Sequence, residues 1–434
     1  MPKLTDILGI NARSADYLSY NRKSARHKAD DKLLTKKMLK KAGVAHPRLL
    51  GIITNATEAR AFNWGKLKDG FAIKPVQGFG GQGIILIKKA MKENGNFLTV
   101  DDKKVKVDDL VLHALDIVEG KYSHNNLPDK AMIEERIKIH PKYKKMAVGG
   151  APDVRIIVYN KIPVMAMLRL PTEESNGKAN LHQGAIGLGI DIATGITTHG
   201  VYKNGSVKYF PDTNIKINGI TVPYWNKILR MAVETQIISK LNYLSVDMLI
   251  DEEKGPVVLE LNDQPGLSIQ LANMTGLRRR LERVEGLEVD EAEKGVKIGK
   301  ALFASRFANR VRFTGEDKPV IGIFEKVKIK NGKKKMVEVK AKIDTGAKGT
   351  SIDHNLAMEL GLLTPENILW TKRVKNSLGL EERTLVALTI KLKNRVIKTR
   401  ASLTERKHLR RLLLIGRRDL KEFVVDPGLV KIRK

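Results

Sequence analysis

The sequence contains no cysteine, and aromatic residues make up only 5% of it. The absence of cysteine excludes disulfide bonds and thiolate metal sites, and it gives no sign of an oxidising compartment. No uninterrupted run of ~18 apolar residues occurs, which argues against a membrane span. Residues 1–20 also lack the apolar centre of a signal peptide. We therefore expect a cytoplasmic enzyme with mainly aliphatic cores.

Acidic residues are scarce relative to basic ones. The chain has 79 Lys plus Arg against 48 Asp plus Glu, a net charge of +31. From Lys318 onward there are 29 basic and 12 acidic residues, a net of +17 over 117 residues. Such charge attracts polyanions, but no recognition helix, zinc finger or aromatic-rich sheet motif accompanies it. Nucleic acid or the ribosome is therefore a secondary partner, and an acidic peptide suits the charge equally well.

The remaining composition predicts a globular chain of several domains. Its 434 residues, 42% of them hydrophobic, are enough for two to four domains. We expect an N-terminal helical segment at 1–45, an α+β core at 46–285, a helix and linker at 286–317, and a small all-β domain at 318–434. The last boundary lies near 310–318, where the mixed pattern changes to short strands with turns.

Local patterns predict the elements of the core. The apolar spacing, with Gly43 as a stop, predicts one basic helix over 23–43. Alternation predicts a strand at 131–139 and a β-hairpin at 153–170, and an amphipathic helix follows at 225–241. The expected sheets are therefore mostly antiparallel.

A glycine-rich loop follows a short strand that ends near Lys74. The loop, GFGGQG at 78–83, leads into a second strand rather than a helix, unlike a Walker or Rossmann loop. Glycines allow backbone amides to approach phosphate oxygens, and Lys74 adds a point charge. The loop therefore indicates phosphate binding, although an ordinary hairpin would give the same local pattern.

Three oxygen ligands on two consecutive strands predict a metal site. Glu260 and Asn262 are two residues apart and share a strand face, and Asp247 on the preceding strand can join that face through the DEEKG turn. Such a set suits Mg²⁺, which also binds phosphates and water. The alternative is a pair of solvated carboxylates at a sheet edge, which the apolar neighbours in VVLELN disfavour.

Arginines on the predicted hairpin complete the candidate site. Arg155 and Arg169 are placed to face a γ-phosphate or an acyl phosphate, and Asn180 and His182 lie in a glycine-rich loop that can contact phosphate or substrate. Ordinary surface salt bridges are the alternative for the arginines. For His182 the alternative is a structural role.

Residues 1–285 resemble the alpha-L-glutamate ligase-related proteins of the ATP-grasp superfamily. The resemblance runs through long motifs: GINARSADYLSYN, DDKLLTKK, IKPVQGFGGQGI, MIEERI, PDVRIIV, SVDMLID and VLELNDQPGLSIQLAN. It implies two α+β lobes that hold ATP between them. It also implies that Lys32 and Lys74 clamp the phosphates under the loop of Gly78, Gly80, Gly81 and Gly83.

The resemblance assigns the other candidate residues as well. It implies that the strand at Glu134, Glu135 and Arg136 is a hinge whose backbone contacts adenine. By the same resemblance, the magnesium ligands are Asp247, Glu260 and Asn262. The resemblance also implies that the transferred phosphoryl group is held in place by Arg155, Arg169 and Asn180.

The implied reaction joins a carboxyl group to an amine. ATP phosphorylates the carboxylate to an acyl phosphate, and an amine, such as that of glutamate or another amino acid, attacks it to form an amide. The cofactors are ATP and Mg²⁺, with Mn²⁺ as an alternative metal. Two departures concern the acceptor. Lys32 comes very early, so we expect the family domain that usually precedes it to be absent or reduced, and DQPGL after Asn262 lacks the arginine expected there.

The C-terminal domain carries the motif KIDTGAKG, in which Asp344 lies in a tight turn, and LLLIGRRDL about 70 residues later. Two such turns can bring two carboxylates together to share one proton. The region resembles retropepsins and the bacterial group labelled ATP-dependent zinc proteases, which implies that Asp344 is the catalytic aspartate. That group tends to have a His where this chain has Asp353, and we expect no zinc here.

Three classes of function stay open. The first is a bifunctional enzyme whose ligase adds an amino acid to a peptide or protein and whose aspartic peptidase trims or reverses the product. The second is a ligase with a non-catalytic dimerising or binding C-terminal domain. The third is a basic protein associated with RNA or the ribosome.

The single Asp-Thr-Gly leads to a prediction about assembly. An aspartic dyad needs two close carboxylates that share a proton, so two chains must each contribute Asp344 about a two-fold axis. We expect a homodimer through residues 318–434, with proteolysis strongest at acidic pH and dimers weakened at low ionic strength. Analytical ultracentrifugation checks this, and a strict monomer that still cleaves peptides would contradict the shared dyad.

Overall fold

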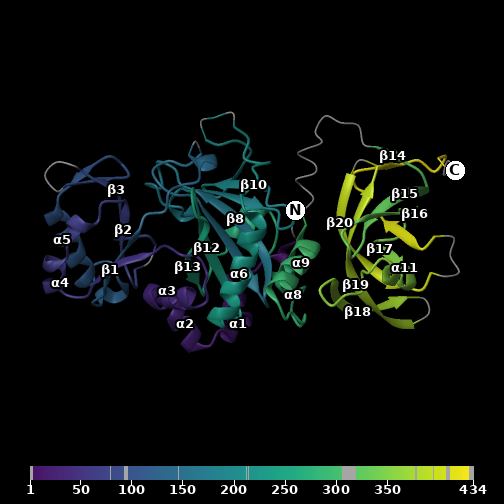
Figure 1. Ribbon diagram of the computed structural model, residues 1–434, viewed down its shortest axis with the longest axis horizontal. Coiled ribbons are helices and arrows are strands. Elements are labelled where there is room, and N and C mark those ends of the chain that lie inside the picture. Colours follow the sequence, from purple (N-terminus) through teal and green to yellow (C-terminus); the bar gives the residue numbers. More distant parts are fainter. Residues whose placement is uncertain are drawn as a thin grey trace. The chain divides into compact units, whose positions relative to one another are not determined.

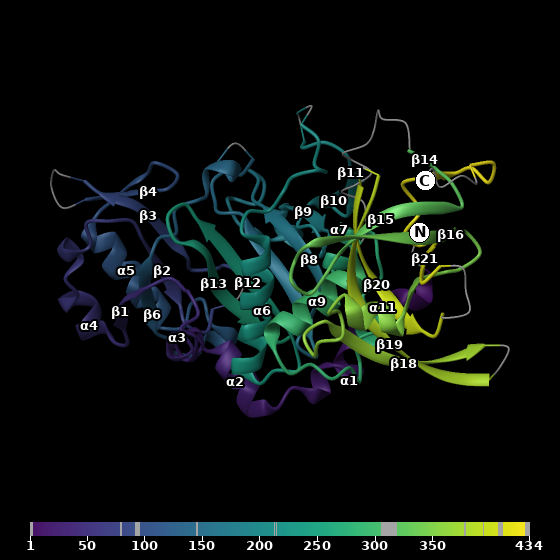
Figure 2. The same ribbon diagram turned by 45° about the vertical axis from the view of Figure 1, so that its right-hand side comes forward.

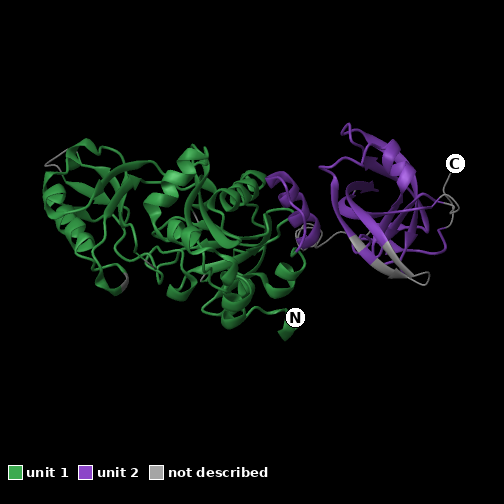
Figure 3. Ribbon diagram, turned by 90° about the horizontal axis from the view of Figure 1, so that it is seen from below, with its two compact units in different colours: residues 1–285, 305–308 green, residues 286–304, 309–434 purple. Residues whose placement is uncertain are grey.

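The computed structural model describes residues 3–78, 80–91, 96–144, 146–211, 213, 215–304, 319–376, 379–393, 395–406 and 411–429. Two compact units make up the chain (Figure 3). Unit 1 comprises residues 1–285 and 305–308, and unit 2 comprises residues 286–304 and 309–434. The boundary predicted near 310–318 lies outside the described residues. No helix in the described part of the chain combines the length and apolarity that a membrane crossing requires.

The N-terminal region forms α1 (Ile10–Asp16), α2 (Lys23–Asp30) and α3 (Lys32–Lys41). The single helix predicted over 23–43 is therefore wrong. Asp31 interrupts it, because its carboxylate accepts hydrogen bonds from the amides of Leu33 and Leu34, at 2.8 and 2.9 Å, and so caps a new helix. The interruption places Lys32 in the first turn of α3.

The first lobe of unit 1 is a six-stranded sheet in the order β1-β6-β2-β3-β4-β5. Helices α4 and α5 pack against it (Figure 1), over a core that includes Trp64, Phe71 and Phe97. The strand predicted over 131–139 ends at Glu135, where the chain leaves the sheet. The bounds are β1 (Leu49–Ile53), α4 (Ala56–Ala61), β2 (Phe71–Pro75), β3 (Ile85–Ala90), β4 (Phe97–Thr99), β5 (Lys104–Val105), α5 (Val107–Val118) and β6 (Ala131–Glu135).

The second lobe is an antiparallel sheet of seven strands in the order β11-β10-β9-β8-β7-β12-β13. Its central strands are buried along their whole length, and α6 packs against β7, β8 and β12. The hairpin predicted at 153–170 is present. The bounds are β7 (Asp153–Tyr159), β8 (Ile162–Leu170), β9 (Ile186–Ile190), β10 (Thr197–Tyr202), β11 (Gly205–Val207), α6 (Trp225–Ser239), β12 (Tyr243–Asp251), β13 (Gly255–Asn262), α7 (Ile269–Asn273) and α8 (Arg278–Glu282).

Unit 2 is a small barrel preceded by α9 (Ala292–Phe303). Six strands close in the order β15-β16-β21-β17-β20-β19, because β15 also pairs with β19, and β18 is added to the outside of β19. The bounds are β14 (Val320–Ile321), β15 (Phe324–Lys330), β16 (Met336–Asp344), β17 (Thr350–Asp353), α11 (His354–Glu359), β18 (Ile368–Asn376), β19 (Gly379–Leu392), β20 (Arg395–Thr404), β21 (Leu413–Gly416) and β22 (Val424–Val425). The expected fold class, two α+β lobes followed by an all-β barrel, is confirmed.

A buried carboxylate joins three segments of the barrel. Asp419 is inaccessible to solvent, and it accepts hydrogen bonds from the hydroxyl groups of Thr350 on β17 and Thr399 on β20, the latter at 2.8 Å. The Thr350 hydroxyl also accepts a bond from the amide of Gly416 at 3.3 Å. These bonds satisfy a group whose burial would otherwise be costly.

We therefore predict that Thr350→Val destabilises the protein by about 2 kcal/mol, because a hydrogen bond to a buried charge is lost while side-chain volume is kept. Thr404→Val on β20 is the matched control, since the buried Thr404 hydroxyl has no partner among the described residues. Urea unfolding followed by circular dichroism checks both variants. Equal stability losses would contradict the role assigned to the Asp419 bonds.

Candidate active site

A large cavity lies between the two sheets of unit 1. Its volume is about 1750 Å³, and residues of both lobes line it. Gly83 and Asp247 are not among the lining residues. Those predicted from the sequence that do line it are Lys32, Lys74, Gly78, Gly80, Gly81, Glu134, Glu135, Arg136, Arg155, Arg169, Asn180, His182, Glu260 and Asn262.

Two lysines share one buried carboxylate on the first lobe. Glu134 on β6 forms ion pairs with Lys74 on β2 and with Lys36 on α3, the latter at 2.7 Å. Lys36 also donates to the carbonyl of Pro47 at 2.6 Å. Burial opposes ionisation of Glu134, but Lys74 and Lys36 outweigh it and hold the pKa of this carboxyl below its usual value.

Lys36 was missed by the sequence analysis. It lies one turn after Lys32, and this i, i+4 spacing was the signal that could have indicated it. Lys36 does not line the cavity but lies behind Glu134. Because two lysines face one carboxylate, the cluster carries a net charge of about +1.

Lys32 fixes the start of the glycine loop. Its ammonium group donates to the carbonyls of Val76 and Gly78, at 3.0 and 2.8 Å. Burial is the main cause that lowers the pKa of Lys32. In the loop, Gly83 has φ +68°, and a Cβ atom there would lie 2.6 Å from the ring of Tyr122, so only glycine fits.

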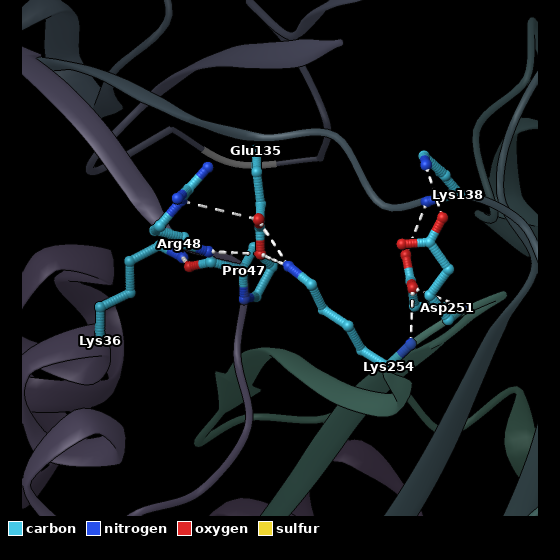
Figure 4. A network of polar contacts seen from close by, with 8 residues as sticks. Lys36, Pro47, Arg48, Glu135, Lys138, Asp251 and Lys254 are labelled. Atoms are coloured by element: carbon cyan, nitrogen blue, oxygen red, sulfur yellow. Dashed lines mark hydrogen bonds and ion pairs between the residues drawn. The ribbon is translucent and has the colours of Figure 1, made fainter. Parts of the chain in front are cut away.

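The last residue of β6 and the segment that follows it are bound to the second lobe at the turn between β12 and β13 (Figure 4). The Glu135 carboxylate accepts from the Arg48 amide at 2.9 Å and from Lys254 in that turn at 2.7 and 2.6 Å. The amide of Lys138 donates to Asp251 at 2.9 Å. The two lobes are thus tied at the hinge predicted around Glu135.

The backbone amides of Glu135 and Arg136 are engaged within the first lobe. They donate to the carbonyls of Arg48 and Gly70, at 2.9 and 3.0 Å. Contact between this hinge and adenine stays a prediction, and it would have to use other backbone groups than these two amides.

A network of four charged side chains lies at the surface of the cavity on the second lobe and directly beneath it. Asp247 on β12 accepts from Arg155 on β7, at 2.8 and 2.6 Å, and from Arg169 on β8, at 2.7 Å. Arg169 also binds Asp153 at 2.6 Å. Burial acts to raise the pKa of Asp247, but Arg155 and Arg169 bring it below its usual value. Asp247 therefore lies beneath two arginines that line the cavity.

Glu260 and Asn262 face the cavity from β13. Glu260 is opposite Asp247 in the sheet, and Asn262 is opposite Ser245. The Asn262 side-chain oxygen accepts from the Gln264 amide at 2.9 Å. These two oxygen ligands fit Mg²⁺, which is often held by one or two carboxylates together with phosphates and water. Among the described residues, no cluster of three His, Asp or Glu side chains has the spacing of a metal cage.

The predicted loop residues Asn180 and His182 border the same cavity. The Asn180 side chain accepts from the His182 amide at 3.1 Å, which caps the short 3-10 helix Leu181–Gln183. The Gln183 side chain approaches the carbonyl of Gly80 at 3.5 Å. This loop therefore meets the glycine loop across the cavity.

Asp344 lies in unit 2 at the end of β16. Its carboxylate accepts from the amides of Gly346 and Ala347, at 3.0 and 2.9 Å, and lies 3.6 Å from the Lys342 ammonium group. The hydrogen bond from Ala347, together with Lys342, lowers the pKa of Asp344. Asp353 caps α11 and also accepts from the Arg406 amide at 2.8 Å, so its carboxylate is used locally.

Comparison with known families gives two matches. The model of the sugar-transfer associated ATP-grasp proteins matches residues 12–286. The model of the retropepsin-like aspartic endopeptidase RimB matches residues 363–434, downstream of Asp344. No curated protein matches the sequence.

Solved structures show further similarities at low identity. The ATP-grasp ligase PsnB with a minimal precursor is 14% identical, and the match covers 61% of this chain and 62% of that one, with a TM-score of 0.34. D-alanine–D-alanine ligase from Bacillus anthracis is 16% identical over 67% of this chain and 71% of that one, with a TM-score of 0.33. A Legionella pneumophila protein of unknown function is 22% identical over 27% of this chain and 100% of that one, with a TM-score of 0.19. The chain thus spans about three fifths of the PsnB ligase.

Because Lys36 and Lys74 share the Glu134 carboxylate, we predict that Lys36 affects nucleotide binding although it does not line the cavity. In Lys36→Met, Glu134 faces Lys74 alone, so less positive charge is available in the cavity, and we expect nucleotide affinity to fall about tenfold. Lys37→Met, an exposed neighbour on α3, is the matched control and should bind normally. Calorimetric titration with a non-hydrolysable ATP analogue measures both. If Lys36→Met binds the nucleotide with unchanged affinity, the charge of Lys36 does not influence the cavity through Glu134, and the prediction is wrong.

Proposed function

Because this chain belongs to the sugar-transfer associated ATP-grasp family, we propose that it is an ATP- and Mg²⁺-dependent carboxylate–amine ligase. The observation that carries the proposal is the cavity between the two sheets of unit 1. There, Lys32, Lys74 and two arginines face Glu260 and Asn262. Cations, oxygen ligands and a glycine loop around one cavity are the groups that phosphoryl transfer from ATP requires.

In the first step, a carboxylate oxygen of the substrate attacks the γ-phosphorus of ATP. The bond between that phosphorus and the β,γ-bridging oxygen breaks, and ADP leaves with the electron pair. Lys32 and Lys74 hold the phosphates, and Glu260 and Asn262 would hold Mg²⁺, which neutralises phosphate charge when bound. Asn180 steadies the transferred group from the loop above.

In the second step, an amine attacks the acyl carbon. The carbon–oxygen bond to phosphate breaks, inorganic phosphate leaves, and the nitrogen gives up a proton as the amide forms. Arg155 and Arg169 stabilise the negative charge in both steps. Their positions are set in advance by Asp247 and Asp153, and such preorganised charge needs no rearrangement during reaction.

The size of the cavity supports a second substrate beside the nucleotide. Its volume of about 1750 Å³ exceeds the roughly 300–1,000 Å³ of sites for one small ligand. The acceptor in this proposal is an amino acid or an acidic peptide or protein, with glutamate as one candidate for the added residue.

For unit 2, we propose an aspartic peptidase that trims or reverses the product. The carboxylate of Asp344 accepts hydrogen bonds from two backbone amides of its own turn. The carboxylates of Asp353 and Asp419 accept hydrogen bonds from other groups of unit 2. The second carboxylate of a dyad would therefore come from another chain. One observation supports the alternative, a non-catalytic dimerising or binding unit: the hydrogen bond from Ala347 and the Lys342 charge lower the pKa of Asp344, which opposes the sharing of a proton.

We predict that Asn262→Ala and Glu260→Ala each reduce Mg²⁺-dependent ADP release by about 100-fold or more, because transition-state charge is no longer neutralised. The assay uses a panel of amino acids and acidic peptides, with mass spectrometry of the products.

Lys74→Ala should weaken ATP binding. Asp344→Asn is the matched control and should keep ligase activity, since separate sites act independently. If Asn262→Ala turns over ATP at the wild-type rate, Asn262 is not a magnesium ligand.

A further inference from the structure

Lysines gather on the outer surface of the unit 2 barrel, over the adjacent strands β16, β15, β19 and β20, which can be followed in Figure 2. Alternate residues of these strands are buried, such as Val327 and Ile329, and the residues between them point outward. We call the exposed lysines the basic face. They are Lys326, Lys328, Lys330, Lys340, Lys391 and Lys398.

Like charges oppose each other directly across this face. Lys326 on β15 pairs in register with Lys340 on β16, and Lys328 pairs in register with Lys391 on β19. Residues in such pairs have Cβ atoms roughly 4.5–5.5 Å apart, and like charges at this position destabilise a sheet. In the described part of the face, Glu338 is the acidic side chain; it lies opposite Lys328 in the sheet and forms an ion pair with Lys326 at 3.0 Å. Barrel stability therefore does not account for these lysines, whereas an anionic partner does.

The spacing of the lysines suits a regular polyanion. Alternate residues on a strand are roughly 6.6–6.8 Å apart and neighbouring strands about 4.8 Å apart, so the lysine positions on the sheet form a grid. Nucleic acid carries one negative charge per nucleotide whatever its sequence. Lysine is a point charge without the fixed planar fork of arginine, which suits contacts that neutralise phosphates without reading bases.

Two other polyanionic partners fit the face less well. Extended acidic peptides are commonly captured at a free sheet edge, but β15, β16, β19 and β20 each pair with a strand on both sides. Binding to a membrane surface is usually strengthened by apolar side chains that enter the lipid. On the described part of this face, the large apolar side chains that are exposed are Met336 and Val396.

We propose that the basic face binds the phosphate backbone of nucleic acid without reading its base sequence. The site lies outside the barrel, and the proposal is independent of both the ligase and the peptidase proposals. The six lysines and Glu338 give the face a net charge of +5, which is part of the net charge of +17 in residues 318–434.

The test uses the full chain with fluorescently labelled single-stranded RNA and duplex DNA, and anisotropy measured over a range of salt concentrations. The face variant combines Lys326→Gln, Lys328→Gln, Lys340→Gln and Lys391→Gln. Because each phosphate contact contributes roughly 0.7–0.9 to the slope of log K against log salt, the slope should become shallower by about 3. The charge-matched control combines Lys37→Gln, Lys121→Gln, Lys203→Gln and Lys227→Gln, exposed lysines of unit 1, and should keep the wild-type slope.

Glu338→Gln provides a change of opposite sign. It releases Lys326 and removes the acid of the face, so binding should tighten severalfold, a gain that misfolding cannot produce. Equal slopes in the two lysine variants would overturn the proposal, because general charge would then account for binding. It would also be overturned if a polyglutamate peptide or phosphatidylserine vesicles showed face-dependent binding and neither nucleic acid did.

Discussion

The carboxylate of Asp247 is completely buried and binds arginines from two other strands, β7 and β8. With Asp153 it completes a network of two acids and two bases that is close to neutral overall. Removing one member would leave a buried charge without compensation, which typically costs several kcal/mol. The floor of the cavity depends on this network, since it fixes the guanidinium groups of Arg155 and Arg169 at the cavity surface.

The opposite wall has a different balance of charge. Two lysines share Glu134, and Lys32 is held by backbone carbonyls rather than by an acid. The net positive charge available to an incoming triphosphate therefore comes mainly from the lysines, while the two arginines offer guanidinium groups of fixed orientation. The ties of Glu135 to Lys254 and of Lys138 to Asp251 hold these two walls at the hinge.

Unit 2 separates its charges between inside and outside. In the interior, two threonine hydroxyls donate to the buried carboxylate of Asp419, and Arg418 lies 3.4 Å from it. On the outside, lysines oppose lysines across neighbouring strands. The hydrogen bonds to Asp419 stabilise the barrel. The opposed lysines destabilise it, and the nucleic-acid partner that we propose would explain why they are present.

Much of the fold followed from local pattern, because strand alternation, turn residues and the glycine loop are local properties of the chain. The α+β core, the hairpin at 153–170 and the all-β C-terminal region were predicted on that basis, whereas the division into two lobes and the roles of most residues around the cavity were implied by the resemblance to ATP-grasp ligases. Local pattern could not predict that Asp31 would divide a helix, because its apolar spacing continues across the cap. It also could not show that Asp247 binds Arg155 and Arg169, or that Glu134 joins Lys36 to Lys74. These pairs are distant in sequence, and only the packing of one strand beside another brings them into contact and decides which charges remain available to a ligand.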